Sequence, residues 1–334
     1  MSKQKVKERT WPALTFGLVI VGVALRIVQF CIERALWFDE ARNSVEILKA
    51  DWTHMLPPHA QQPTSFGFLA IERLIVSALG DSEWALRLFP LLTGIAAVVL
   101  CAVVARRLLR GVAIPTAVAF IALSGPAIYF STEVKSYSSD LFFGLVLAWA
   151  LLRLDDRDEV HAMDFVELSL LGSIAIWISY TSIFVLAAGG FLLLGPHLLR
   201  RHIQSTVWVC LMGAVWLANF GAYYALVISH WSGADWLNQH WENAFPASGL
   251  EVWGLLVWVT EVFTASFRQP LGTPATWICL ALFLAGLVRA IVRRQRQMLF
   301  FMGIIALTLL AGVLTLYPYQ GRLLLFLAPA LAFG

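Results

Sequence analysis

The sequence predicts an all-α, polytopic membrane protein with about ten transmembrane spans. Of its 334 residues, 59% are hydrophobic and only 13% are charged, and the mean hydropathy is +0.75. A soluble domain carries about twice this share of charge. Several apolar runs approach the ~20 residues that cross a bilayer as a helix. Every cluster of Lys and Arg between these runs fits on one side of the membrane.

The basic clusters orient the first half of the chain. The N-terminal MSKQKVKER is expected in the cytoplasm, so the span Trp11–Cys31 runs outward. The next basic cluster, around Arg106, also belongs in the cytoplasm, which leaves one inward span, Trp84–Ala105. The intervening stretch Pro63–Gly80 is apolar but short, and it carries two charges at its middle. We therefore expect it to form an amphipathic helix on the outer surface.

The later spans alternate in the same way. They are expected at Val112–Phe130, Ser139–Leu152, Phe165–Tyr180, Ser182–Leu198, Val207–Ile228, Ala275–Val292, Leu299–Leu316 and from Leu323 onward. Surface helices are expected in two external loops, residues 32–83 and residues 229–274, the second at the apolar stretch Leu250–Thr264. We interpret residues 1–334 as one transmembrane domain that stops within its last apolar run, which predicts a C-terminal truncation.

Two adjacent carboxylates, Asp39 and Glu40, lie in the first external loop, within ALWFDEARNSVEIL. If Asp39 begins a helix, the apolar residues form one stripe at helical spacing. Asp39, Asn43 and Glu46 then face the other way, toward an external cavity. The sequence alone leaves two roles open for Asp39: it is suited to act as a general base, and equally to cap the helix and interact with its dipole.

Two further external segments add charged and aromatic residues. STEVKSY places Glu133, Lys135 and Tyr137 in a very short turn, and YPYQGRLLLF places Tyr319 and Arg322 at another outer edge. Glu133 and Lys135 can project into an outer cavity or form an exposed ion pair of little energetic value. Arg322 can reach lipid headgroups or hold a phosphate through paired donors.

Other kinds of chemistry lack a signal in the sequence. No phosphate-binding loop, nucleophile elbow or metalloprotease helix occurs, and no basic stripe predicts nucleic-acid binding. The external histidines form no compact ligand pattern, so the sequence requires no cofactor, although it does not exclude a divalent metal. The four cysteines lack zinc-site spacing and predict free thiols. Outward-facing acids and cations beside surface helices suit the transfer of a polar group from an anionic, lipid-linked donor.

Five short segments, spread in order over almost the whole chain, resemble one enzyme family. They are WFDEARNS, QQPTSFGFLAIERL, EWALRLFPLLTG, STEVKSY and YPYQGRLLLFLAP. The chain resembles the protein O-mannosyltransferase and lipid A aminoarabinose transferase family of the GT-C superfamily. The resemblance implies a glycosyltransferase of the plasma (inner) membrane that moves a sugar from a polyprenyl-phosphate donor to a hydroxyl of a lipid, glycan or protein. The reaction is expected on the external, periplasmic face, with inversion at the anomeric carbon.

The resemblance also implies roles for individual residues. Asp39 matches the general base, Glu40 a residue that supports it, and Glu133 a second acidic position. The remaining implied residues are Arg322, Lys135, Arg87 and His59 for binding the donor phosphate, and Tyr137, Gln62 and Tyr319 for lining the substrate site. The chain departs from the family twice. Lys135 replaces an arginine and loses its planar fork, and Gln62 stands where relatives carry a basic residue before Pro-Pro-Leu.

Two other functions stay open at this point. A transporter, such as a flippase for lipid-linked sugars, typically shows internal repeats and charges at the membrane midplane. Here no repeat is found, and Arg26 is the main charge well inside a clear span. The second alternative is a catalytically inactive assembly subunit of the same fold, because Gln62–Thr64 departs from the family pattern. The external position of the carboxylates favours an enzyme.

Overall fold

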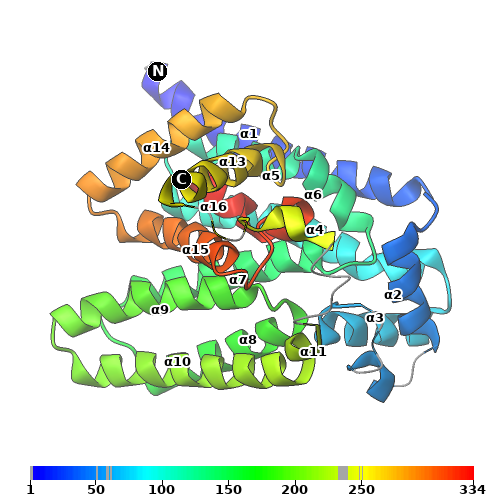
Figure 1. Cartoon of the computed structure of the whole chain (residues 1–334). Helices are drawn as coiled ribbons and strands as arrows, with labels where there is room; N and C mark the ends of the chain where they lie inside the picture. The colour runs from blue at the N-terminus through cyan, green and yellow to red at the C-terminus, as the bar shows by residue number, and fades with distance from the viewer. Residues whose placement is uncertain are drawn as a thin grey trace.

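The computed structural model describes residues 3–49, 52–57, 60, 62–231, 240–247, 249 and 251–334, and within them every regular element is helical. Figure 1 shows the arrangement. The elements are α1 (Lys3–Cys31), α2 (Phe38–Lys49), η1 (Trp52–Met55), α3 (Phe66–Leu79), α4 (Glu83–Leu108), α5 (Ala113–Ala122), α6 (Gly125–Tyr129), η2 (Phe130–Thr132), α7 (Tyr137–Asp155), α8 (Ala162–Ile178), α9 (Ser182–Leu199), α10 (Ile203–Tyr223), η3 (Tyr224–Ile228), α11 (Ser229–Trp231), η4 (Glu242–Ala244), α13 (Val252–Arg268), α14 (Thr276–Val292), α15 (Arg296–Val313), η5 (Gly321–Leu327) and α16 (Ala328–Phe333).

The predicted spans all coincide with helical structure, but their count of ten is not confirmed. Six described helices are long and apolar enough to cross a membrane, and the bent pair α5–α6 raises the number to seven. Both α8 and α14 have only 17 residues, and the last apolar run forms only η5 and α16. The two expected surface helices form as α3 and α13, and their position at the membrane surface stays a prediction.

The predicted span Val112–Phe130 is broken rather than straight. Its two halves, α5 and α6, meet at an angle of 51°. The Ser124 hydroxyl accepts a hydrogen bond from the Ala127 N–H at 3.1 Å and so caps the start of α6. Pro126 follows in the first turn, where its missing N–H costs nothing. The bend leads the chain into the segment Ser131–Tyr137, which we call the outer turn.

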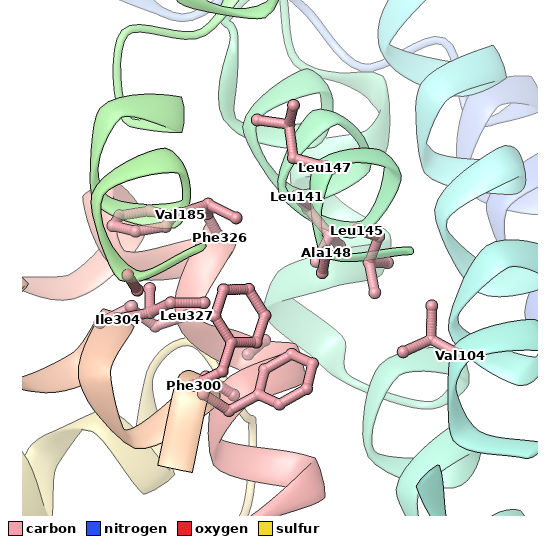
Figure 2. Close-up of a cluster of buried hydrophobic side chains, with 14 of the residues drawn as sticks. Val104, Leu141, Leu145, Leu147, Ala148, Val185, Phe300, Ile304, Phe326 and Leu327 are labelled. Atoms are coloured by element: carbon pink, nitrogen blue, oxygen red, sulfur yellow. The ribbon is translucent and has the colours of Figure 1, made fainter. Parts of the chain in front are cut away.

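The main hydrophobic core surrounds α7 and holds η5 in place. Figure 2 shows Leu141 and Leu145 of α7 between Val104 of α4 on one side and Phe326 of η5 on the other. The Phe326 ring also stacks on Phe184 of α9, with 5.8 Å between their centroids. Because η5 begins beside Arg322, this core fixes where the Arg322 backbone lies relative to the start of α7.

A second hydrophobic cluster fastens the first external loop to the bundle. It joins Ile47 of α2, Phe68 of α3, Leu86 of α4 and Val134 of the outer turn, and α2 and α3 lie together at the right of Figure 1. Glu72 of α3 is also fully buried, and burial raises its pKa well above its usual range. Desolvation penalises the charged form of this carboxyl.

The basic clusters gather at the opposite end of the bundle. There the chain forms ion pairs between Arg200 and Asp158 at 3.1 Å and between Arg296 and Asp155 at 3.3 Å, around a cavity of about 480 Å³. This end is separated from the start of α7 by the 19 residues of that helix, or about 28 Å at 1.5 Å per residue. That length matches the hydrocarbon thickness of a bilayer.

Candidate active site

The predicted base and one of the predicted phosphate ligands are in direct contact. Arg322 donates to Asp39, with 2.9 Å between Nη2 and Oδ2. The two side chains are 20% and 23% exposed, so the pair is accessible from outside the protein. Asp39 lies in the first turn of α2, where the unpaired backbone N–H groups favour a carboxylate. The predicted helix at Asp39 is confirmed. The structure also shows that Asp39 pairs with Arg322, which is 283 positions away in the chain.

Two aromatic rings flank the Arg322 guanidinium. Its central carbon lies 4.8 Å from the centroid of the Trp37 ring and 5.7 Å from that of Tyr137. Cation–π contacts of this kind stabilise the charge, and a stacked guanidinium keeps its donors in one plane at its edge. The Tyr137 ring thus lies beside Arg322, and its role in lining the substrate site stays a prediction.

Glu40 is fully buried and connects α2 to two other elements. Its carboxylate accepts hydrogen bonds from the backbone N–H of Val134 at 3.1 Å and of Trp37 at 3.3 Å. The guanidinium groups of Arg34 and Arg87 lie 3.6 and 3.7 Å from it. Glu40 thus holds the outer turn and α4 beside Asp39, a position that suits the supporting role implied by the family resemblance.

Removing the Glu40 carboxylate should destabilise this end of the protein. We expect Glu40→Ala to lower the free energy of unfolding by about 3–5 kcal/mol, because arginines buried against it lose their counter-charge. Glu83→Ala is the matched control. Glu83 contacts the same Arg87 at 3.3 Å but is half exposed, so its loss should cost less than about 1 kcal/mol. Thermal unfolding in detergent measures both, and equal midpoints would remove the anchoring role from Glu40.

The outer turn carries two buried residues of opposite charge. Glu133 is 1% exposed, and its Oε2 has no hydrogen-bond partner. Burial, and then the Glu40 carboxylate, raises the pKa of Glu133 to about 7, although Arg322 and Arg34 oppose this. Lys135 is 8% exposed, and burial lowers its pKa to about 8, against the pull of Asp39. Both groups therefore change protonation state near neutral pH.

A hydrogen-bond network connects the outer turn to the rest of the first external loop. Asn43 donates to the Val134 carbonyl at 2.8 Å and accepts from the Thr64 hydroxyl at 3.1 Å. The Lys135 ammonium donates to the Gln62 side chain. Gln62 therefore contacts the cation of the outer turn, at the place where the family pattern carries a basic residue. Sequence reasoning had put Asn43 on the polar face of α2 but had given Thr64 no role.

The polar face of α2 turns inward, as the helical spacing predicts. Of the three residues expected on this face, Asn43 and Glu46 are buried, and the Asp39 side chain is 23% exposed. Glu40, which was not assigned to this face, is buried as well, whereas Phe38 and Val45 of the apolar side are 64% and 42% exposed. The apolar stripe is therefore free to face lipid while the carboxylates face the protein. This arrangement is typical of a helix that lies at a membrane interface.

Sequence reasoning missed Arg34 and Trp37. The Arg34 guanidinium lies 4.0 Å from the Tyr129 ring centroid and donates to the Thr132 carbonyl at 3.2 Å. It therefore adds a second cation above the outer turn. The available signal was its position, because Arg34 stands in the same external loop as Asp39, shortly before it.

Two of the predicted site residues, Arg87 and Tyr319, contact groups other than the Asp39–Arg322 pair. Arg87 lies behind Glu40 and is 3% exposed, and the Tyr319 hydroxyl accepts from Ser266 at 3.3 Å. His59 lies outside the described residues. Their roles in binding phosphate or lining the site stay predictions. Within the described part of the chain, no three His, Cys, Asp or Glu side chains gather as metal ligands.

Comparisons with known proteins concern the family and the fold of this chain. Residues 63–224 match the family model described as dolichyl-phosphate-mannose-protein mannosyltransferase. The resemblance predicted from the sequence is confirmed. The matched range contains the outer turn with Glu133 and Lys135, whereas Asp39 and Arg322 lie on either side of it. In a search of curated proteins, none matches the chain.

The fold of this chain resembles that of a solved protein. It is similar to the crystal structure of ArnT from Cupriavidus metallidurans bound to undecaprenyl phosphate, with a TM-score of 0.57 and 14% sequence identity. The similarity covers 97% of this chain and 59% of the ArnT chain. At this identity the comparison concerns the fold, and it agrees with the predicted all-helical, multi-pass architecture.

Proposed function

We propose that this protein is a membrane glycosyltransferase that moves a sugar from a polyprenyl-phosphate donor to an acceptor hydroxyl. The contact between Asp39 and Arg322 carries the proposal. It places a carboxylate that can take a proton beside a guanidinium that can hold a phosphate. Lys135 supplies a second positive charge. It lies close enough to both residues that Asp39 raises its pKa and Arg322 lowers it. A fold shared with a protein bound to undecaprenyl phosphate supports this class of donor.

The proposed mechanism is a single in-line displacement. The donor phosphate replaces Asp39 as the partner of Arg322, which frees the carboxylate to accept the proton of the acceptor hydroxyl. The acceptor oxygen then forms its bond to the anomeric carbon while the bond from that carbon to the phosphate oxygen breaks. Arg322 and Lys135 stabilise the departing lipid phosphate. One displacement inverts the configuration at the anomeric carbon.

We place this reaction on the external face of the membrane. The ends of α4, α7 and α9 carry the Arg-rich clusters, and the Asp39–Arg322 pair lies beside the starts of α4 and α7. Because basic clusters favour the cytoplasm, the candidate site is external and the N-terminus of α1 is cytoplasmic.

The pH dependence of kcat/KM should follow the protonation of the Lys135 ammonium. Its pKa is lowered to about 8, so the ammonium is present below this value and is lost as the pH rises through it. We expect kcat/KM, which reports the free enzyme, to fall about tenfold per pH unit well above 8. Arg stays charged at these values, so Lys135→Arg should extend activity to higher pH. If kcat/KM fell at the same alkaline pH in the wild type and in Lys135→Arg, Lys135 would be ruled out as the cause of the fall.

Native mass spectrometry of the purified protein tests the donor class. We expect a co-purifying polyprenyl-phosphate sugar, and we expect Arg322→Gln to lose it. Incubation with acceptor should convert the bound lipid to polyprenyl phosphate. A bound donor that stays uncleaved in the presence of acceptor would instead favour a transporter or an inactive subunit, and movement of intact donor across proteoliposome membranes would distinguish these two.

A further inference from the structure

A fully buried arginine lies inside the first span. Arg26 of α1 is 0% exposed, and its guanidinium donates to the carbonyl oxygens of Gly22 at 2.9 Å, Ile121 at 3.0 Å and Ala122 at 3.2 Å. Charged residues inside spans are costly, and those that occur usually have a function or a specific partner. Here the partners are backbone carbonyls, and two of them come from the end of α5.

These two carbonyls are open because α5 stops at Ala122. The last carbonyls of a helix have no partner within it. In a continued helix the Ala122 carbonyl would pair with residue 126, which is a proline without an N–H. Arg26 supplies the missing donors, and its positive charge is favourable at a helix C-terminus. The α5–α6 break and Arg26 therefore complement each other.

Close packing links Arg26 to the outer turn. A Cβ atom on Gly94 of α4 would lie 2.5 Å from the Ser131 Cβ and 3.5 Å from the Arg26 Cδ. A Cβ atom on Gly22 would lie 2.8 Å from the Ala122 Cβ. The two glycines thus let α1, α4 and the broken helix approach at the level of Arg26. Ser131, which packs here, begins the segment that contains Glu133 and Lys135.

We propose that Arg26 is a positioning residue for the candidate active site. By binding the free carbonyls of α5 it fixes the α5–α6 break, and the break sets where the outer turn presents Glu133 and Lys135. The structural half of this proposal is independent of the reaction. The effect on turnover rests on the proposed function.

The structural half is tested by thiol labelling. Ser131 is 0% exposed, so in a protein whose other cysteines are replaced, Ser131→Cys should react slowly with a membrane-impermeant maleimide. Adding Arg26→Met should speed labelling by at least about tenfold, because the outer turn loses its fixed position. Arg26→Lys, which keeps the charge with a single donor group, should fall between. Thr15→Val is the control, since Thr15 is buried in the same helix but its hydroxyl donates within α1, to the Trp11 carbonyl at 2.8 Å.

Turnover provides the second readout. In folded protein, judged by an unchanged elution profile, Arg26→Met should lower kcat more than tenfold. It should also shift the pH at which kcat/KM falls on the alkaline side, which is attributed to Lys135. Arg26→Lys should partly restore both. A merely structural role would reduce the yield of folded protein and leave this pH profile unchanged. Slow labelling of Ser131→Cys in both Arg26 variants would overturn the proposal. If the wild-type protein transfers no sugar, the proposed function fails, and the labelling rates still decide the role of Arg26.

Discussion

Replacing Asp39 by Asn is expected to lower kcat for sugar transfer by about 10²–10⁴-fold, the usual contribution of a general base. Asparagine keeps the size of the side chain and an oxygen that can accept from Arg322, 2.9 Å away in the native protein. It cannot take the proton of the acceptor hydroxyl. Initial rates in proteoliposomes supplied with donor and acceptor measure the effect.

Affinity for the donor separates this loss from misfolding. We expect Asp39→Asn to bind undecaprenyl phosphate at least as tightly as the wild type, because a negative charge next to the phosphate site has been removed. Asp81→Asn is the matched control, since Asp81 is an exposed acid in the same external loop, and it should leave both rate and affinity unchanged. A normal kcat in Asp39→Asn would exclude Asp39 as the base.

Arg322→Gln is expected to reduce kcat/KM by about 10²–10³-fold. Truncating one partner of a hydrogen-bonded charge pair costs about 2–5 kcal/mol. The expected loss lies within this range, at about 3–4 kcal/mol, because each 1.4 kcal/mol is a factor of ten. The loss should appear in KM and in kcat, because Arg322 is proposed to hold the phosphate both before and after the sugar leaves. Arg322→Lys should recover only part of it, since an ammonium lacks the bidentate fork.

Arg42 provides a control for this prediction. It is exposed on α2, and its guanidinium lies 4.2 Å from the Phe38 ring centroid, so it is also an arginine over an aromatic ring. Arg42→Gln should leave the affinity for undecaprenyl phosphate within about twofold, because the Arg42 guanidinium lies over the Phe38 ring and not at the Asp39–Arg322 pair. If Arg42→Gln and Arg322→Gln weakened binding equally, the effect would reflect general surface charge and not a phosphate site.

The side of the bundle on which the candidate residues gather could be predicted from the sequence. Basic clusters fixed the direction of the spans, and this placed Asp39, Glu133 and Arg322 at one end before any contact was known. Helical spacing also predicted which face of α2 is polar. The first inference depends on the preference of Lys and Arg for the cytoplasmic side, and the second on helical periodicity. Both can be read from short stretches of sequence without knowledge of tertiary contacts.

Which of the two carboxylates, Asp39 or Glu40, is buried could not be predicted in the same way. Neighbouring residues on a helix point about 100° apart, so a small rotation of α2 decides which carboxylate is buried. That rotation is set by the outer turn, whose Val134 N–H bonds to Glu40 at 3.1 Å. The α5–α6 break depends in a similar manner on Arg26, which is almost a hundred positions away in the chain.

Transfer of a radiolabelled sugar in proteoliposomes, with wild-type protein and Asp39→Asn compared side by side, tests the central claim most directly. The account predicts that the wild-type protein releases polyprenyl phosphate and attaches the label to an acceptor hydroxyl with inverted anomeric configuration. It predicts that Asp39→Asn binds the same donor and leaves it uncleaved. Equal cleavage by both proteins, or movement of intact donor across the membrane without cleavage, would contradict it.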